Sequence, residues 1–521
     1  MKDRFYILFI ILIGIILYGS TIKGVFGNPD TQKIIDQHLT TPPGVLELSP
    51  EQGRYGHVLS LAETGHYDFS KEFVEFNSPD SAYFNGKFFS FFAPGISYLV
   101  LPAFQLGWTF NLAQLFSFAF IAVISIISLI FLFYIGQHIL KLPRWLSLFA
   151  VMVFGFASTS WSYAATLYQH PVTAYCIVSS FYAIWRYKQE DKYSWYWAIL
   201  VWFNYGLGIF IDYPNAVLLL PLMVYFLISS MKLIHSLGKI KFSIRNSFYS
   251  TSIIFILLIL LHGLHNQTYF GSWKKISGGL LSYKTYVSLQ ETNNVNIESA
   301  IKQEEQKKNV GTFFQEKNIP QGLFTLLISD DRGLLFYSPI FILALFAIFK
   351  LRSGINLEHT TLITLLVVNI FFYSGWGDPH GGWAFGPRYL IPSLPILSLY
   401  VALWIYNKGM GIGNKILAFF LFAYSSAISL VGAVTTNAIR QKFKVEGFTD
   451  ITYNFLFNID FLKKNQTASF IYNNFFIDHI SLVHYFFAIY GLLLITVIFV
   501  LFLLPHYAGI MGTGDNGDSP Q

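Results

Sequence analysis

Long uncharged apolar runs alternate with polar segments along most of the chain. A helix that crosses the hydrocarbon core of a bilayer needs about 20 predominantly apolar residues. By that measure we expect about twelve spanning helices, near residues 5–22, 111–136, 146–167, 171–185, 193–211, 213–231, 246–266, 333–349, 360–377, 389–406, 416–437 and 481–505. The pattern therefore predicts an all-α fold, a polytopic transmembrane helical bundle.

The first apolar run could also be a cleavable signal peptide, because Lys2 and Arg4 precede it. The run continues through Leu17 and Tyr18 without a clear small-residue cleavage site, which favours a retained anchor. We therefore expect residues 1–22 to form the first spanning helix, with the amino terminus on the cytoplasmic side.

Basic residues concentrate in short loops between the predicted spans. These loops cover residues 137–145, 186–192, 232–245, 350–357 and 407–415. Because lysine and arginine favour the cytoplasmic side of a membrane, the loops are predicted to face the cytoplasm. This orientation requires that the Pro-Gly-interrupted stretch 84–107 does not cross, so we predict a juxtamembrane or re-entrant segment against the outer face.

The long polar segments then fall on the non-cytoplasmic side. They cover residues 27–110, 267–332, 376–388 and 438–480. Any chemistry that this protein performs is therefore expected outside the cytoplasm.

Composition excludes several classes of protein. Of 521 residues, 54% are hydrophobic and 12% are charged, whereas soluble proteins carry about 25% charged residues. This excludes a soluble enzyme and a nucleic-acid binder. The single cysteine excludes a disulfide framework and a cysteine-based metal site. No GxxxxGK(S/T) phosphate-binding loop occurs, so an ATP-driven pump is not expected and an enzyme would need a pre-activated substrate.

Three ionisable residues stand out near the outer face. Glu51 opens the segment PEQGRYGHVLSLAETGHYDF, whose apolar spacing predicts an amphipathic interfacial helix. His170 lies in a very short turn, and Asp212 lies between two spans with almost no loop. Each has a structural alternative: Glu51 could complement a helix dipole, His170 could bond nearby backbone, and Asp212 could pin a tight turn.

The segment SGWGDPHGGWAFGPRYLIPSLP, residues 374–395, is the richest in candidate chemistry. It holds five glycines together with Asp378, His380 and Arg388. Glycines next to ionisable side chains indicate backbone that lies close to a ligand. Arg388, at the outer end of a span, suits a phosphate because a guanidinium is permanently charged and bidentate. An arginine that snorkels to the interface is the alternative.

The order of these motifs resembles the GT-C glycosyltransferases that use polyprenyl-phosphate sugars, such as the protein mannosyltransferases and the aminoarabinose transferases of lipid A. The resemblance is densest in GRYGHVLSLAETGHY, YFNGKFFSFFAPG, WSYAATLYQHP, RGLLFYSP and GGWAFGPRYLIPSLP. It implies a transmembrane catalytic module over residues 1–405, including the outer loop 27–110. We expect C-terminal helices over 406–505 with an outer loop at 438–480, and a disordered cytoplasmic tail at 506–521.

In that family an acid of the first outer loop, usually in an Asp-Glu pair before an Arg-Tyr pair, takes the acceptor proton or positions the acceptor. Glu51 and Gln52 occupy those places here, before Arg54 and Tyr55. His170 stands where the family often has a second acid. The resemblance therefore implies that Glu51 is the catalytic base and that His170 assists it.

The resemblance also assigns cations to the donor phosphate. Arg388 matches the family's phosphate-side arginine. The family's lysine before the juxtamembrane prolines is replaced by Phe92 or a neighbour, and Lys87 is close enough in sequence to substitute for it. Arg332, in the charged cluster 330–332, is a third candidate cation, although a solvated loop end explains that cluster equally well. Substrate contacts are expected from Arg54, Tyr55, Asp212, Asp378, His380, Trp383 and Tyr389.

The reaction that the resemblance implies is an inverting transfer of a sugar from a polyprenyl-phosphate carrier to a protein, lipid or glycan acceptor. Relatives with lipid monophosphate donors generally need no metal, so no metal or other cofactor is expected, although Asp378 and His380 could supply ligands. The expected partners are the lipid-linked sugar, the acceptor and membrane lipid, with no nucleic acid. High Phe, Ile and Lys content indicates an AT-rich prokaryotic genome, and hence a plasma membrane with the active site facing outside.

Two other classes stay open. A transporter or flippase of lipid-linked sugars would also be polytopic, but it usually shows inverted repeats and charges near the bilayer midplane. A non-catalytic glycolipid-binding protein would explain the loss of the second acid and of the family lysine. Replacement of Glu51 by Gln separates the classes, because it should abolish transfer by an enzyme and leave lipid binding by a non-catalytic protein unchanged.

Overall fold

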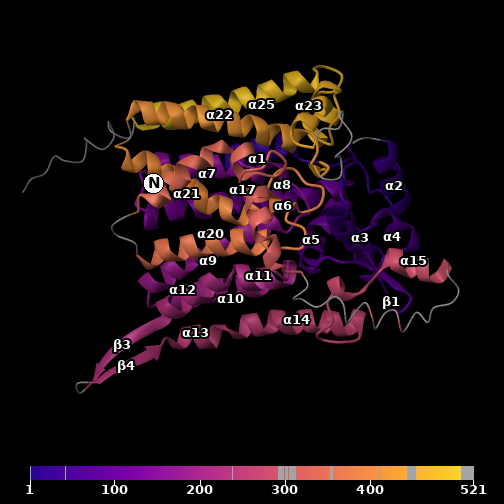
Figure 1. The fold of residues 1–521 in the computed structure, drawn as a ribbon, viewed down its shortest axis with the longest axis horizontal. Helices are drawn as coiled ribbons and strands as arrows, with labels where there is room; N and C mark the ends of the chain where they lie inside the picture. The colour runs from indigo at the N-terminus through magenta and orange to yellow at the C-terminus, as the bar shows by residue number, and fades with distance from the viewer. Residues whose placement is uncertain are drawn as a thin grey trace, which may run out of the picture.

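The chain folds as a bundle of long helices with smaller elements gathered at its ends (Figure 1). The computed structural model describes residues 2–40, 43–236, 239–291, 299, 303, 313–351, 356–409, 411–442 and 453–505. The tail predicted at 506–521 lies outside the described residues.

Eight helical segments in the described part of the chain are long and apolar enough to cross a membrane, which identifies an integral membrane protein. They are Asp3–Thr21 in α1 (Lys2–Thr21), Ala113–Ile139 in α6 (Ala113–Tyr134) and η1 (Ile135–Ile139), Ser194–Ile211 (α10), Asn246–Phe270 in α13 (Asn246–Thr251) and α14 (Ile253–Phe270), Leu357–Ser374 (α20), Arg388–Asn407 in η6 (Arg388–Ser393) and α21 (Leu394–Asn407), Ile412–Val434 (α22), and Leu482–Leu503 in α25 (Leu482–Ile498) and η8 (Phe499–Leu503).

The predicted count of about twelve spans is not confirmed. Three further apolar segments, Arg144–Phe156, Asn215–Ser230 and Pro339–Phe349, are shorter than the eight. The run predicted at 171–185 falls in α9 (His170–Gln189), whose hydroxyl and basic side chains lower its hydropathy. The shorter helical elements of the bundle are α7 (Arg144–Phe156), α8 (Ser160–Tyr163), α11 (Asn215–Leu218), α12 (Leu220–Ser230), α17 (Ile319–Leu327), α18 (Leu334–Tyr337), η5 (Pro339–Phe341) and α19 (Ile342–Phe349).

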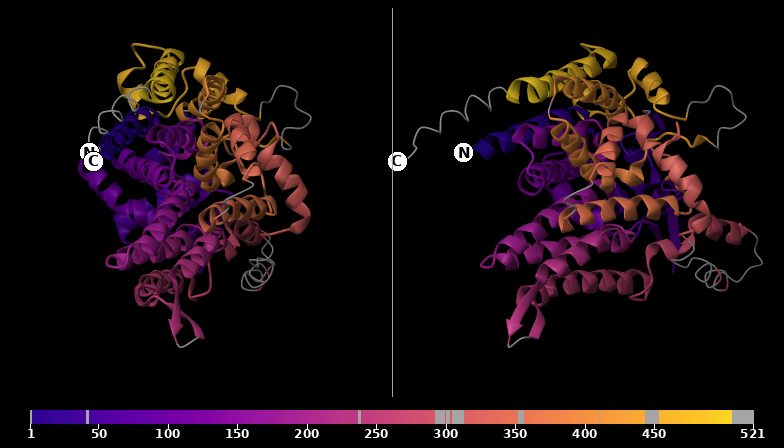
Figure 2. Two further views of the ribbon diagram at one scale, coloured as in Figure 1. Left: turned by 90° about the vertical axis from the view of Figure 1, so that its left-hand side faces the viewer. Right: turned by 60° about the vertical axis from the view of Figure 1, so that its left-hand side comes forward.

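The spans differ in how much protein surrounds them. The span that contains α21 is 89% buried, whereas the span that contains α14 is 17% buried. Figures 1 and 2 show α14 at one margin of the bundle and the C-terminal pair α22 and α25 at the opposite margin. Helix α14 exposes isoleucine and leucine side chains, as a lipid-facing helix does.

One end of the bundle collects most of the elements that do not span, and we call it the loop-rich end. Figure 1 shows α2, α3, α4, β1 and α15 there, with the N-terminus and the β3–β4 hairpin at the other end. The elements outside the spans are α2 (Thr31–Thr40), α3 (Ser49–Thr64), α4 (Lys71–Phe76), α5 (Gly95–Thr109), η2 (Ser277–Gly279), α15 (Tyr283–Glu291), η4 (Glu316–Asn318), α23 (Leu456–Lys463) and α24 (Phe470–Phe475). The strands are β1 (Ser81–Phe84), β2 (Lys87–Ser90), β3 (Met231–Ser236), β4 (Lys239–Ile244) and β5 (Leu281–Ser282).

Two small sheets were not predicted from the sequence. Strand β1 pairs antiparallel with β2 and with β5, and β3 pairs antiparallel with β4. Asn85 and Gly86 join β1 to β2 with positive φ at both positions, which suits a two-residue hairpin turn. The stretch predicted as juxtamembrane or re-entrant therefore contains the turn and strand β2, followed by α5, which is not among the eight candidate spans.

Candidate functional site

Helix α3 carries Glu51 and Arg54 into the interior of the loop-rich end. Pro50 lies in its first turn, where the missing N–H costs no helical hydrogen bond, and Gly65 ends the helix with φ of 72°. Every residue from 50 to 59 is buried. The sequence predicted an amphipathic helix lying in the membrane interface, but this part of the helix is enclosed by protein.

Two glycines allow this burial. A Cβ on Gly56 would lie 2.2 Å from the ring of Phe73 in α4, and a Cβ on Gly53 would lie 2.7 Å from the Cβ of Ser90 in β2. Any larger side chain at either position would collide with a neighbour. The backbone of α3 can therefore lie directly against α4 and β2, which fixes the direction in which its charged side chains point.

Lys23, Glu47 and Glu51 form a buried group of charged side chains, which we call the charged triad. Lys23 follows α1, and its Nζ lies 2.9 Å from Glu47 Oε2 and 3.8 Å from Glu51 Oε2. The backbone N–H of Asn437 donates to Glu47 Oε2 at 2.8 Å, and the N–H of Glu47 donates to Glu51 Oε2 at 3.2 Å. No side chain of the triad is more than 5% exposed.

The triad changes the proton affinity of its members. Burial raises the pKa of Glu51, the Lys23 ammonium lowers it and Glu47 raises it again, with a result of about 7. Burial lowers the pKa of Lys23, but the two carboxylates raise it by more, so it ends above its ordinary value. The charged form of Lys23 is therefore favoured, while the pKa of Glu51 lies near neutral pH.

A hydrogen-bonded chain joins Arg54 to Asp212 through Gln169. The Nη2 of Arg54 donates to Gln169 Oε1 at 2.7 Å, and Gln169 Nε2 donates to Asp212 Oδ2 at 3.1 Å. Burial raises the pKa of Asp212 and Arg54 lowers it, with a result of about 6. The guanidinium of Arg54 also lies 4.7 Å from the ring centre of Phe92, the residue that stands near the family's lysine position.

Arg388 lies among aromatic rings at the start of η6. Its guanidinium carbon is 5.0 Å from the ring centre of Tyr168 and 5.5 Å from that of Tyr389. A Cβ at Gly381 would lie 3.1 Å from Arg388 Nε, so the glycine leaves room for the arginine. Nε and Nη1 of Arg388 are buried with no hydrogen-bond partner among the described residues. Buried charged donors are ordinarily paired, so these two atoms favour an anionic ligand.

His170 lies beside the same aromatic rings, at the start of α9. Its ring centre is 5.8 Å from that of Tyr389 and 6.3 Å from that of Tyr168. Its Nε2 is buried without a hydrogen-bond partner in the described part of the chain. Tyr389 in turn stacks on Tyr373 with ring centres 4.3 Å apart.

Tyr168 connects these groups. Its ring lies near the guanidinium of Arg54, at 5.9 Å, as well as near that of Arg388. The charge of Glu51 contributes to the raised pKa of Tyr168, after burial and against the effect of Arg388. Arg54, His170 and Arg388 lie near the ring of Tyr168, Tyr389 and Asp212 interact with Arg388, and the charge of Glu51 acts on Tyr168.

Arg332 belongs to a second hydrogen-bond network, which adjoins the residues around Arg388 at Gly382. It is fully buried, its Nη1 donates to Asp331 Oδ1 at 2.5 Å, and its Nη2 donates to the carbonyl of Ile439 at 2.9 Å. These bonds hold the segment after α22 against the chain that precedes α18. Most donors of Arg332 therefore have protein partners, although its Nε has none among the described residues. Burial raises the pKa of Tyr163 and the charges of Arg388 and Arg332 both lower it, so Arg332 stays a candidate for the donor phosphate.

Asp378 and His380 join that second network. The N–H of Gly382 and the side chain of Gln441 donate to Asp378 Oδ2 at 2.8 and 2.9 Å. The nitrogens of His380 lie 3.6 Å from Asp378 and 3.6 Å from Asp331. Burial raises the pKa of Asp378, but the hydrogen bonds lower it by more, to about 2. In the described part of the chain no group of three or more His, Cys, Asp or Glu side chains could hold a metal ion.

Three other predicted site residues have different surroundings. Lys87 lies in an exposed position at the start of β2 and forms an ion pair with Asp68 at 3.0 Å. Tyr55 is buried against the ring of Phe104. Trp383 is 41% exposed, and the guanidinium of Arg440 lies 5.4 Å from its ring centre. No hydrogen bond or ion pair between described residues connects these three to Glu51 or Arg388.

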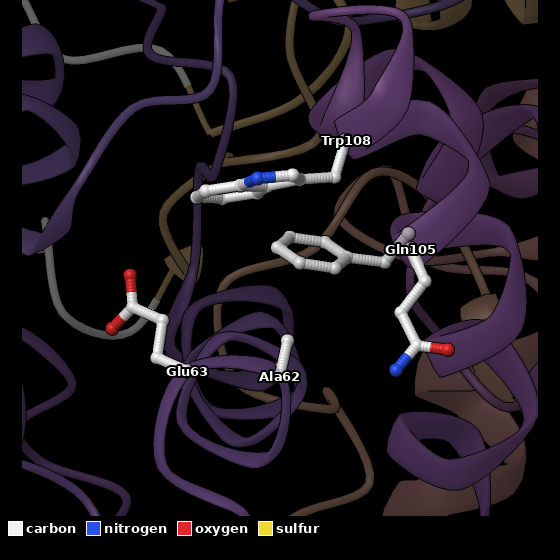
Figure 3. Close-up of a pocket in the computed structure, with 5 residues that line it drawn as sticks. Ala62, Glu63, Gln105 and Trp108 are labelled. Carbon is white, nitrogen blue, oxygen red and sulfur yellow. The ribbon is translucent and has the colours of Figure 1, made fainter.

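Two grooves flank the exposed end of α3. One, of about 340 Å³, lies between α3 and α5 and is lined by Ala62, Glu63, Phe104, Gln105 and Trp108. Figure 3 shows the Trp108 ring and Ala62 facing the same space, with Glu63 on one side and Gln105 on the other. The second, of about 300 Å³, shares Glu63 and extends to α4. Neither groove is lined by Glu51 or Arg388.

Sequence reasoning missed Lys23 and Gln169. Lys23 is the first basic residue after the first apolar run, and Gln169 directly precedes His170. Glu47 was visible only as one of many acids in the first outer loop, four residues before Glu51. That spacing was the available signal, since side chains four apart lie close together where the chain is helical or nearly so.

No protein-family model and no curated protein sequence matches the chain. Among solved structures, it is similar to ArnT from Cupriavidus metallidurans bound to undecaprenyl phosphate, with a TM-score of 0.44 and 11% identity over 95% of this chain and 77% of that one. It is also similar to the archaeal oligosaccharyltransferase AglB from Archaeoglobus fulgidus in complex with an inhibitory peptide and a dolichol-phosphate, with a TM-score of 0.44 and 9% identity over 84% of this chain. The chain spans 56% of the length of AglB. These similarities concern the course of the chain, so the chemistry of this protein rests on its own side chains.

Proposed function

We propose that this protein is a membrane glycosyltransferase that moves a sugar from a polyprenyl-phosphate carrier to an acceptor on the non-cytoplasmic face. The observation that carries the proposal is that two features both act on Tyr168. One is Arg388, with two buried donors that have no protein partner among the described residues. The other is Glu51, a buried carboxyl with a pKa of about 7. The motif resemblance of residues 1 to about 405 supplies the class of donor.

In the proposed reaction an acceptor oxygen attacks the anomeric carbon of the sugar while the bond from that carbon to the phosphate oxygen breaks. The configuration at the anomeric carbon inverts, because attack and departure take place on opposite faces. The acceptor proton passes to the Glu51 carboxylate. Arg388 stabilises the charge that develops on the departing lipid phosphate, since hydrogen bonds from a charged guanidinium to such an anion are short and strong.

Other residues of the site would orient these groups. The chain from Arg54 through Gln169 to Asp212 keeps the Arg54 guanidinium bound to protein, so Arg54 is proposed to hold the turn before α9 in place. His170 and Tyr389 would line the space beside Arg388. Asp378, His380 and Arg332 are proposed to hold segments of the chain, because protein groups already satisfy their main contacts.

The test is donor turnover by the purified protein in lipid, offered a panel of radiolabelled polyprenyl-phosphate sugars. We expect release of polyprenyl phosphate, with a loss of about 10²- to 10⁴-fold in Glu51→Gln. Glu72→Gln on α4 is the matched control, because that carboxyl is exposed, and it should turn over donor like the wild type. Absence of release from every donor, combined with saturable donor binding, would contradict the proposal and favour a carrier, a flippase or a binding protein.

A second variant tests the phosphate contact. Arg388→Gln should lower turnover by about 10²- to 10³-fold, because it removes the charged donors aimed at the leaving group. Arg440→Gln is the control, since Arg440 is exposed and lies over Trp383. Equal turnover by Arg388→Gln and the wild type would exclude Arg388 as the phosphate ligand.

A further inference from the structure

The charged triad holds one basic and two acidic side chains in a site that water scarcely reaches. With Lys23, Glu47 and Glu51 all ionised, the group carries one net negative charge. An unbalanced charge is costly to bury, so a state in which the two carboxyls hold one proton between them is favoured. The question is then which carboxyl keeps that proton.

The contacts of the two carboxyls differ. Glu47 lies 2.9 Å from the Lys23 ammonium and also accepts the N–H of Asn437 at 2.8 Å. Glu51 lies 3.8 Å from the same ammonium and accepts the backbone N–H of Glu47 at 3.2 Å, and the backbone of Leu167 also favours its ionised form. Shorter contacts with a cation and a donor stabilise the ionised form of a carboxyl, so this geometry favours Glu51 as the carboxyl that holds the proton.

Neighbouring elements present other titratable groups to the triad. Tyr163 on α8, Tyr168 before α9 and His38 on α2 are electrostatically coupled to its carboxyls. Burial raises the pKa of both tyrosines, which favours their neutral hydroxyls, and lowers the pKa of His38, which disfavours its cationic form. The positive charge that bears directly on the two carboxyls comes from Lys23.

We propose that Lys23 and Glu47 are positioning residues that set the proton affinity of Glu51. Glu47 binds the Lys23 ammonium, and Glu51 is left as the carboxyl that gains and loses the proton. This inference rests on the proposed function, in which Glu51 is the base. Glu51 first loses its proton to solvent, then takes the acceptor proton as the new glycosidic bond forms, and returns that proton to water after the product leaves.

Opposite effects of two substitutions test this role. Lys23→Met removes the attractive charge and should raise the pH at which Glu51 ionises, whereas Glu47→Gln removes the repulsive charge and frees Lys23 for Glu51, and should lower it. Shifts of about 1 unit or more are expected, since a charge within about 4 to 6 Å moves a pKa by this amount. Lys23→Arg keeps the positive charge, so Glu51 should ionise at the same pH in this variant as in the wild type.

Two measurements follow the ionisation of Glu51 in the full-length protein in lipid. The first is the pH dependence of kcat/KM for donor turnover, whose rising limb should have its midpoint near the Glu51 pKa of about 7. The second is the carboxyl C=O band in pH-difference infrared spectra, assigned by its loss in Glu51→Gln. Lys71→Met and Glu72→Gln, both exposed on α4, are matched controls that should move neither midpoint.

The outcomes separate this inference from the proposed function. Opposite shifts of the infrared band without turnover of any donor would support the triad and contradict the transferase. Turnover that depends on Glu51, with equal midpoints or shifts of the same sign in Lys23→Met and Glu47→Gln, would support the transferase and overturn the triad. If Lys23→Met does not fold, Glu47→Gln decides alone: a lower midpoint supports the inference and an unchanged one overturns it.

Discussion

At the scale of single residues, Glu51 is completely buried, and among the described residues it shares its one nearby cation, Lys23, with Glu47. Glu47 is closer to that cation, so the ionised form of Glu51 is not fully compensated. Its pKa of about 7 expresses this imbalance. Such a carboxyl contributes little to the stability of the fold. It is well suited to proton transfer, because its charged and neutral forms are close in free energy at neutral pH.

Burial of Glu51 predicts a pH-dependent cost in stability. A carboxyl whose pKa is raised by folding stabilises the fold below its ordinary pKa of 4.5, and this contribution is lost as the pH rises to about 7. The glutamine of Glu51→Gln cannot ionise. The unfolding free energy of this variant should therefore increase relative to that of the wild type as the pH rises, by at most about 3 kcal/mol. Thermal unfolding in lipid from about pH 5 to about pH 8 measures this difference. A difference that is constant over this range would contradict a raised pKa at Glu51.

At the scale of elements, α3 is positioned by close approach of backbones. Gly56 faces Phe73 of α4, and Gly53 faces Ser90 of β2. Besides α5, the neighbours of α3 thus include a short helix and a hairpin strand, and a periodicity of apolar residues indicates neither of these two. The placement of Glu51 depends on these contacts as much as on the helix itself.

Gly56→Ala should therefore be destabilising. The added methyl would lie 2.2 Å from the Phe73 ring, and overpacking of this kind costs about 1–3 kcal/mol. Gly19→Ala in α1 is the control, because a Cβ there meets nothing within 4 Å and alanine favours helix. Thermal unfolding of both variants checks the prediction, and equal stability of Gly56→Ala and the wild type would show that α3 is not packed against α4 in this way.

At the scale of the whole molecule, the C-terminal helices are attached to the elements that carry the site. Asn437, after α22, donates to Glu47 of the triad and to the carbonyl of Ser162. The N–H of Phe470, in α24, donates to the carbonyl of Ile22, next to Lys23. The predicted division between residues 1–405 and 406–505 stays a prediction, and contacts across it hold Glu47 in place.

The orientation of the bundle yields a further prediction. The basic loops predict that the loop-rich end faces away from the cytoplasm. Cys176 is buried, so the wild type should be inert to a membrane-impermeant maleimide. Lys71→Cys on α4 should react in intact cells, whereas Lys408→Cys, exposed after α21, should react only after permeabilisation. The reverse pattern would place the candidate site in the cytoplasm.

Much of the architecture could be predicted because it depends on local composition. A run of about 20 apolar residues must satisfy its backbone internally in a bilayer, so it forms a helix whatever its neighbours are. The shorter and more polar segments, such as α9, follow no such rule, and the number of spans was not predictable in the same way. The β1–β2 hairpin was missed because its strands are four residues each.

The candidate site was predictable in part for a related reason. Glu51, His170, Asp212 and Arg388 stood out because ionisable residues are rare at the edges of apolar segments, and in the structure each of them interacts with Tyr168 or Arg388. Arg332 and Lys87 stood out on the same grounds, yet each is paired with a nearby aspartate. Charge and position in the sequence cannot distinguish a cation that protein already satisfies from one that is open to a ligand.

The sequence by itself determined that this chain is a helical membrane protein with long polar segments, since apolar length and charge are properties of contiguous residues. Tertiary structure alone decided which charges meet. Lys23 reaches Glu47 and Glu51 across more than 20 positions of the chain, and Asn437 reaches Glu47 across 390. Such pairings depend on how helices pack and on how much water they exclude, and burial then sets whether a carboxyl is a salt-bridge partner or a proton acceptor.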